Sequence, residues 1–183
     1  MVPADPSRRV FLIGFMGAGK TSVGRALARR LGWRFHDLDD VIEAQEGRSV
    51  AAIFAESGEP AFRQAERLAL RSLLQEDRSS GDLVIALGGG TFVQPENRQL
   101  IEQAMGTTVL LEAPLEELRR RCNAENRVRP LAQQEARFAE LFAARRQGYE
   151  RAQFRVATLG KAVEEVAQEI ERILSAVKPE VQQ

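Results

Sequence analysis

The stretch GFMGAGKT, residues 14–21, constrains the fold of this chain more than any other, because it matches the pattern G-x-x-x-x-G-K-[ST] at every position. An apolar stretch precedes it, and an amphipathic stretch that closes at Gly32 follows it, as expected for a strand and a helix joined by a loop. Glycines let such a loop wrap around a phosphate with its N–H groups pointing inward, and the helix N-terminus adds a partial positive charge. The sequence therefore predicts a strand–loop–helix unit that binds nucleotide phosphates.

Apolar strand-like segments and amphipathic segments alternate along the rest of the chain. Further strands are expected around residues 33–38, 83–87, 106–113 and 154–158, and further helices around residues 39–47, 49–57, 59–75, 96–104, 114–122, 135–146 and 163–174. Strands that alternate with helices form a parallel sheet covered on both faces. We predict a three-layer αβα fold with a central five-stranded parallel sheet, a single domain over residues 8–176, and flexible tails at residues 1–7 and 177–183.

Composition excludes several classes of partner. The 26 basic and 26 acidic residues cancel, so no overall field favours nucleic acid or an anionic membrane, and a small substrate fits better. Cys122 is the only cysteine, which rules out an internal disulfide and suits a reducing cytosol. His36 is the only histidine, which argues against a histidine-based metal site, and the apolar residues 10–16 are too short to span a membrane. We expect a soluble, cytoplasmic protein.

Acidic residues near the end of the second strand are candidates for a magnesium site. Lys20 of the phosphate loop can reach the terminal phosphates, and the Thr21 hydroxyl can bind Mg²⁺. The buried strand at residues 83–87 ends in glycines where many phosphate-handling proteins carry an aspartate. Asp37 and Asp39 are two residues apart at a strand end, so they are expected to point to the same side and to face the phosphate loop.

The helix that follows these acids needs a cap. Asp40 and Glu43 have the spacing of a capping arrangement, and we predict that they cap the helix that contains Val41 and Ile42. Capping leaves Asp37 and Asp39 unexplained, because two more carboxylates at a helix end would repel each other. A cation and an acceptor hydroxyl would both favour them there.

The phosphate loop and the acids belong to a longer set of motifs. In order, the set reads GFMGAGKTSVGRALARRLG, FHDLDDVIE, GRSVAAIF, GEPAFRQAE, LGGG and RPL. This set resembles the shikimate kinase family, and the resemblance runs from about Val10 to Tyr149. It implies a P-loop kinase that phosphorylates the 3-hydroxyl of shikimate with ATP and Mg²⁺, in the pathway to aromatic amino acids, and that acts as a monomer.

The resemblance assigns roles to particular residues. Asp37 corresponds to the acid that supports Mg²⁺ through a water, and Asp39 to the residue that meets the acceptor hydroxyl as a base or an orienting group. Arg63, in AFRQAE, matches the arginine that grips the substrate carboxylate; its spacing alone, with Arg67 and Arg71 at four-residue intervals and Glu66 between, would favour a solvated helix face. The residues expected to contact ATP in the phosphate loop are Gly17, Ala18, Gly19, Lys20, Thr21 and Ser22.

A second arginine of the family precedes a Pro-Leu-Tyr segment by two residues. Here Gln147 and Gly148 replace the proline and the leucine before Tyr149. Counting back from Tyr149 selects Arg145, with Arg146 as its rival. This departure from the family pattern leaves open how the helix ends and where the guanidinium points.

The remaining assignments concern the glycines and a lid. Gly88, Gly89 and Gly90 match the glycine stretch against the substrate, where a side chain would occupy the place of the acceptor. A helical substrate-binding subregion is expected at about residues 38–68 and a lid at about residues 122–136.

Four of the arginines in or near the expected lid are candidates for contact with the nucleotide. Arg129 matches the lid arginine that reaches the phosphates on closure, and Arg127 is an alternative. Either Arg120 or Arg121 is a candidate to stack on adenine, although clustered arginines on a helix are as often simply solvated.

Two other functions compete with this hypothesis. Another small-metabolite kinase of the same fold, such as a gluconate or nucleoside monophosphate kinase, would share the loop and lid but not the ordered motifs DLDD, FR and LGGG. A nucleotide-dependent switch or binding module would lack acceptor-site residues, and the N-K-x-D motif of GTPases is absent from the sequence. The presence of Asp39, Arg63 and the three glycines favours an enzyme.

Overall fold

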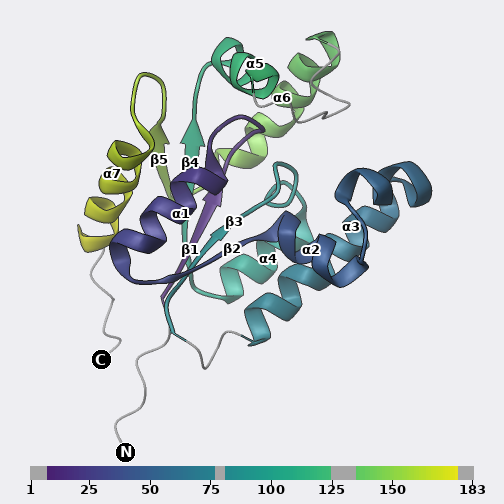
Figure 1. Cartoon of the computed structure of the whole chain (residues 1–183), viewed down its shortest axis with the longest axis horizontal. Helices are drawn as coiled ribbons and strands as arrows, with labels where there is room; N and C mark the ends of the chain where they lie inside the picture. The colour runs from purple at the N-terminus through teal and green to yellow at the C-terminus, as the bar shows by residue number, and fades with distance from the viewer. Residues whose placement is uncertain (1–7, 77–80, 125–134, 177–183) are drawn as a thin grey trace, which may run out of the picture.

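Five parallel strands form one sheet at the centre of the molecule (Figure 1). The computed structural model describes residues 8–76, 81–124 and 135–176. The strands are β1 (Arg9–Ile13), β2 (Arg34–Asp37), β3 (Leu83–Ala86), β4 (Thr107–Glu112) and β5 (Phe154–Ala157), in the order β2-β3-β1-β4-β5. The predicted fold class and the predicted five-stranded parallel sheet are confirmed.

The register of the sheet brings two loops together. β1 lies between β3 and β4, with Leu12 opposite Ala86 and Ile13 opposite Leu110. All five residues of β1 are buried, as expected for a strand covered on both faces. Because the carboxyl ends of β1 and β3 are adjacent, the phosphate loop after β1 and the glycines after β3 lie at the same edge of the sheet.

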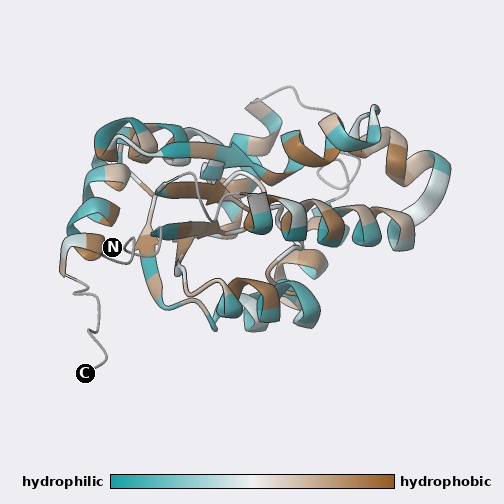
Figure 2. Ribbon diagram, turned by 90° about the horizontal axis from the view of Figure 1, so that it is seen from below, coloured by the Kyte–Doolittle hydropathy of each residue, from teal (hydrophilic) through white to brown (hydrophobic). Residues whose placement is uncertain are grey.

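Helices cover both faces of the sheet. α1 (Lys20–Leu31) packs along α7 (Val163–Ala176) on one face, while α3 (Val50–Glu76) and α4 (Pro95–Gln103) lie on the other (Figure 1). α2 (Leu38–Glu46), α5 (Leu115–Ala124) and α6 (Glu135–Tyr149) stand at the carboxyl edge of the strands. Figure 2 shows the apolar strands between helices whose outer surfaces are largely polar, so the three-layer architecture is confirmed.

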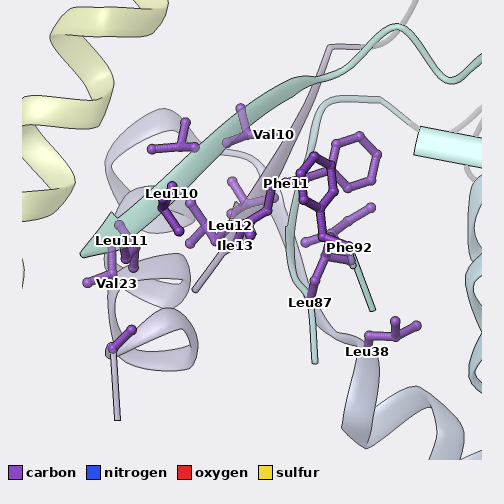
Figure 3. Packing of buried hydrophobic residues seen from close by; sticks show 14 of the residues in the cluster. Val10, Phe11, Leu12, Ile13, Val23, Leu38, Leu87, Phe92, Leu110 and Leu111 are labelled. Atoms are coloured by element: carbon purple, nitrogen blue, oxygen red, sulfur yellow. The ribbon is translucent and has the colours of Figure 1, made fainter. Parts of the chain in front are cut away.

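The core follows the alternation of side chains along β1. Leu12 faces α1, where Val23 is buried, and Phe11 points to the opposite face, close to Phe92 (Figure 3). Both Phe11 and Leu12 are fully buried. Truncating a phenylalanine in such a position to alanine typically costs about 3–5 kcal/mol of stability. The edge of the sheet that carries the loops is therefore built on a rigid base.

The predicted helix cap at Asp40 is wrong. The first helical residue of α2 is Leu38, and its N-cap is Asp37, whose Oδ1 accepts a hydrogen bond from the N–H of Asp39 at 3.1 Å. Glu43 instead accepts from the N–H of Val50 at 2.9 Å. Because the strand ends at Asp37, Asp39 lies in the first turn of a helix, whereas it had been expected at the end of the strand on the same side as Asp37.

α3 consists of two helical segments that meet at a kink, as predicted for residues 49–57 and 59–75. Gly58 at the kink has a φ of 77° and a ψ of 174°, which are not helical. α6 continues to Tyr149, three residues beyond the predicted end at Arg146. No helix within the described ranges is both long and apolar enough to cross a membrane.

Candidate active site

The phosphate loop connects β1 to α1 in the predicted way. Gly19 is the N-cap of α1, with a φ of 88°, and it provides no side chain to cap the helix. The first turn of α1 also contains no acidic residue, so its N–H groups meet no side-chain carboxylate of that turn. The Lys20 ammonium donates to the carbonyl oxygens of Gly14 at 2.9 Å and Phe15 at 3.1 Å, which holds it over the loop.

Thr21 and Asp37 form the oxygen-rich part of the site. The Thr21 hydroxyl donates to Oδ2 of Asp37 at 2.6 Å, so the two candidate magnesium ligands lie side by side. Among the described residues, no cluster of three or more His, Cys, Asp or Glu side chains is placed to hold a metal. A pair of hard oxygen ligands fits Mg²⁺, which usually takes one or two protein ligands and completes its octahedron with phosphate oxygens and water.

The glycine turn after β3 is the point where the predicted acceptor residues meet. A Cβ at Gly88 would lie 3.0 Å from Oδ1 of Asp39, and a Cβ at Gly89 would lie 3.0 Å from Nη1 of Arg145. A Cβ at Gly90 would lie 2.7 Å from Nη2 of Arg63. The structure thus brings together residues from α2, α3, α6 and the turn, which are far apart in the sequence.

These three glycines are needed for space, since none of them is among the glycines with positive φ. We had expected a side chain at this turn to obstruct the acceptor itself. It would first collide with the side chains of Asp39, Arg145 and Arg63, which already occupy that space. The close approach of one carboxylate and two guanidinium groups to a bare backbone is suited to binding an anionic hydroxy compound.

Arg63 does not belong to a solvated helix face. Its guanidinium lies 5.1 Å from the ring centre of Phe62, donates to Glu59 at 3.1 Å and donates to Glu66 at 3.0 Å. These contacts turn it toward the glycine turn. Phe62 in turn packs on the half-exposed ring of Phe54, with the ring centres 4.4 Å apart.

Glu66 is a supporting residue that the sequence analysis missed. It is fully buried and accepts hydrogen bonds from the Thr91 hydroxyl at 2.6 Å and from the Asn97 amide at 3.3 Å. A buried carboxylate is stable only when it is paired and hydrogen-bonded, and Arg63 provides the counter-charge. The signal in the sequence is the spacing of three residues between Arg63 and Glu66, which places the two side chains on the same face of a helix.

Arg145 is the second arginine at the glycine turn, and Arg146 is not. The guanidinium of Arg145 lies 5.6 Å from the ring centre of Phe15 and interacts with the nearby Tyr149 side chain. Desolvation by burial lowers the pKa of Arg145, which still leaves it cationic near neutral pH. Arg146 is exposed, and its nearest ionic partner is Glu150 at 3.9 Å.

Tyr149 is a second residue that the sequence analysis used only as a landmark. Its ring is buried, and its hydroxyl donates to the carbonyl oxygen of Gly89. Burial raises the pKa of Tyr149 to about 12, against the opposing effect of the nearby Arg145. The phenol is therefore protonated and can donate to Gly89 throughout the physiological range.

The arginines of α5 differ from one another. Arg121 donates to the hydroxyl of Thr158 at 3.0 Å and approaches the carbonyl oxygen of Gly17 at 3.5 Å, which places it beside the phosphate loop. Arg120 is exposed and pairs with Glu117. The hydrogen bonds from Arg120 and Arg121 hold the pKa of Glu117 at about 2, well below its ordinary value.

The predicted lid falls mostly outside the described residues. α5 ends at Ala124 and α6 begins at Glu135, so Arg127 and Arg129 lie in a part of the chain that the structure does not describe. Their predicted contact with the phosphates remains a prediction.

Comparison with known proteins identifies the family. The family model for shikimate kinase matches residues 16–175, which include the acceptor-site residues and all but the first two residues of the phosphate loop. The chain belongs to the shikimate kinase family. A shikimate kinase of Geobacter metallireducens is 47% identical over 166 residues, covering 89% of this chain and 89% of its own length. A shikimate kinase of Geobacter sulfurreducens is 44% identical and covers 92% of this chain and 91% of its own length.

Solved structures agree with this family. A shikimate kinase from Acinetobacter baumannii in complex with shikimate matches with a TM-score of 0.83 and 35% identity, over 94% of this chain and 96% of its own. A gluconokinase from Sinorhizobium meliloti has a TM-score of 0.62 at 16% identity, so its likeness is one of fold alone. The predicted shikimate kinase family, the kinase activity class and the P-loop fold are confirmed.

Proposed function

We propose that this chain transfers the γ-phosphoryl group of ATP to the 3-hydroxyl of shikimate, as its family does, and that the residues around the glycine turn carry out the transfer. The single observation that supports this most strongly is the meeting of Asp39, Arg63 and Arg145 at Gly88–Gly90, next to the phosphate loop. Phosphoryl transfer depends mainly on positioning and on charge stabilisation, and this arrangement supplies both.

The nucleotide is held at the N-terminus of α1. The N–H groups from Gly17 to Ser22 surround its phosphates, and Lys20 moves from the loop carbonyls to the terminal phosphates. Arg121, which already approaches Gly17, is better placed than Arg120 to lie against adenine. Arg120 is bound to Glu117 on the exposed side of the helix.

Thr21 and Asp37 would hold Mg²⁺, Thr21 directly and Asp37 through a water. The ion would neutralise the charge that develops between the β- and γ-phosphates. Asp37 keeps a second role as the N-cap of α2, which holds Asp39 in the first turn of that helix. One helix start thus separates the carboxylate for the cation from the carboxylate for the acceptor.

The acceptor lies between the glycine turn and the two arginines. Arg63 and Arg145 bind the carboxylate, and Asp39 accepts a hydrogen bond from the 3-hydroxyl. As the hydroxyl oxygen forms its bond to phosphorus, the bond from phosphorus to the ADP oxygen breaks, and the hydroxyl proton passes to Asp39. The proposed substrate-binding subregion spans residues 38–68. Arg63 lies in its second half, in the segment of α3 that follows the kink at Gly58.

A lid over about residues 122–136, with Arg129 on the phosphates, would exclude water during transfer. α5 and α6 flank residues 125–134, which make up most of this proposed lid. We further propose that the protein is a cytoplasmic monomer. The single cysteine, Cys122, is buried and in no disulfide, in keeping with a reducing compartment.

The direct test is ADP release with ATP and Mg²⁺ in the presence of shikimate, gluconate or AMP. We expect release to depend on shikimate and to be absent with the other two acceptors. Release that depends on gluconate or AMP would overturn the proposed substrate and leave only the kinase fold. A reaction that proceeds equally well after chelation of the divalent cation would overturn the role given to Thr21 and Asp37.

A further inference from the structure

The phenol of Tyr149 and the guanidinium of Arg145 meet at the same glycine of the acceptor site. The O–H of Tyr149 donates to the carbonyl oxygen of Gly89, and Nη1 of Arg145 lies 3.0 Å from the position of a Cβ on Gly89. The phenol can still accept a hydrogen bond on its oxygen, whereas a guanidinium can only donate. Tyr149 is therefore placed to act on both the Gly89 backbone and Arg145.

The bond to Gly89 also determines the direction of a neighbouring donor. The carbonyl of Gly89 and the N–H of Gly90 belong to the same planar trans peptide, so they point in opposite directions. Gly89 follows Gly88 at the end of β3 and adopts no left-handed conformation that would fix this plane by itself. A hydrogen bond from a buried side chain to the carbonyl oxygen removes the remaining rotational freedom of that plane.

The N–H of Gly90 therefore points away from Tyr149. The Cβ position of Gly89 lies 3.0 Å from Nη1 of Arg145, and the Cβ position of Gly90 lies 2.7 Å from Nη2 of Arg63. Each of the two cations thus approaches one of the two glycines that this peptide joins. Within the described part of the chain, the N–H of Gly90 donates to no acceptor, so it can serve a bound anion.

We propose that Tyr149 is a positioning residue of the acceptor site, which holds Arg145 and the Gly89–Gly90 peptide in the arrangement that receives the substrate carboxylate. This inference rests on the proposed function, because it assumes that the carboxylate binds between Arg63 and Arg145. Tyr149 itself stays behind both groups and does not touch the acceptor. Its ring provides the rigid attachment, since it is buried at the end of α6.

The first test is the Tyr149→Phe variant, which keeps the ring and removes only the hydroxyl. We expect the KM for shikimate to rise about tenfold, because Arg145 and the Gly90 N–H lose their orientation, while the KM for ATP stays within about twofold. The matched control is Ile170→Val, a fully buried position on α7 that lowers stability away from the site. It should leave both KM values unchanged. An unchanged KM for shikimate in Tyr149→Phe would overturn the proposal.

The second test is a double-mutant cycle between Tyr149→Phe and Arg145→Ala. If Tyr149 acts partly through Arg145, then removing the hydroxyl from a protein that already lacks the guanidinium should raise the KM for shikimate by less than about threefold. Independent effects, with the two increases multiplying, would show that Tyr149 only supports the fold.

A spectroscopic measurement on the unmodified protein covers the case in which the variant does not fold. Tyr149 is the only tyrosine, so isotopically labelled tyrosine gives one ring signal. We expect this signal to shift when shikimate is added without nucleotide, and to stay in place with the carboxamide analogue of shikimate. No shift with shikimate would overturn the inference. If the wild type shows no shikimate-dependent ADP release, the proposed function has failed instead.

Discussion

The guanidinium of Arg63 occupies the space that a side chain on Gly90 would need. A Cβ at Gly90 would lie 2.7 Å from Nη2, 2.8 Å from Nη1 and 3.0 Å from Cζ of Arg63. Arg63 can approach the backbone of the glycine turn this closely only because position 90 carries no side chain. The glycine and the arginine therefore form one unit of the site, although 27 positions separate them in the sequence (90 minus 63).

Replacing Gly90 by alanine should displace Arg63 rather than unfold the protein, since the displaced atoms are the end of a long side chain. We expect the KM for shikimate to rise at least about tenfold, with nucleotide affinity unchanged, in steady-state kinetics and ATP titrations. Gly106→Ala is the matched control, because its Cβ would lie 2.3 Å from the ring of Phe11 in the core. That control should lower stability and leave the KM unchanged; the opposite pattern would contradict this account.

Asp37 and Asp39 should separate by function when each is changed to asparagine. Asp39→Asn should lower kcat by about 10²–10⁴ and leave ATP affinity nearly intact, because only the acceptor hydroxyl loses its partner. Asp37→Asn keeps the helix cap but removes the charge beside Thr21, so the Mg²⁺ dependence of nucleotide binding should weaken. The measurement is kcat together with ATP titrations at several Mg²⁺ concentrations. Equal loss of nucleotide affinity in both variants would place Asp39 at the metal.

The close packing of Gly148 on Val93 should be necessary for aiming Arg145. A Cβ at Gly148 would lie 3.1 Å from both Cγ atoms of Val93 and 3.3 Å from its Cα. We expect Gly148→Leu to destabilise the fold by about 1–3 kcal/mol and to raise the KM for shikimate, because the last turn of α6 must move away from the glycine turn. Adding Val93→Ala should recover part of both losses in urea denaturation and kinetics. No recovery would argue against this contact.

Ionisation of Tyr149 should destabilise the protein at alkaline pH. Burial raises the pKa of Tyr149 to about 12, while an exposed tyrosine in the unfolded chain titrates near about 10. Between these values the unfolded chain loses a proton that the folded chain keeps. Stability therefore falls as the pH rises from about 10 to about 12, by at most about 1.4 kcal/mol per pH unit.

This slope can be measured by urea denaturation across the alkaline range, together with tyrosinate absorbance. Because Tyr149 is the only tyrosine, the absorbance reports this residue alone. Tyr149→Phe should lack this part of the pH dependence. A tyrosinate signal that appears near its ordinary pH in the folded protein would show that the phenol is not buried as described.

Met105 offers a stabilising substitution away from the site. It follows α4 with a φ of 51° and is 83% exposed, so its side chain gains little from burial while its backbone adopts a left-handed conformation. Met105→Gly should raise the free energy of unfolding by about 1 kcal/mol and leave kcat and both KM values unchanged. A lower unfolding free energy would show that the methionine side chain contributes contacts that outweigh the strain.

Features carried by contiguous residues could be predicted from the sequence. The phosphate loop, the strand before it and the helix after it follow from local spacing. The glycines of the loop, Lys20 and Thr21 are neighbours in the sequence, so their arrangement does not depend on distant segments. The alternation of strands and helices predicted the parallel sheet, because hydrophobic periodicity and right-handed crossovers leave few arrangements. Asp39 and Arg63 were found through their motifs, and the structure places both at the glycine turn.

Features that depend on distant segments were decided only by the tertiary structure. The helical cap at Asp37, the buried position of Glu66 and the choice of Arg145 over Arg146 depend on how α2, α3 and α6 approach the sheet edge. Neighbouring residues on a helix differ by about 100° in direction, so a count along the sequence cannot say which arginine faces inward until the helix is packed. The sequence alone therefore determined the chemistry and the fold, whereas the packing of α6 against the glycine turn determined which side chains meet and what holds them there.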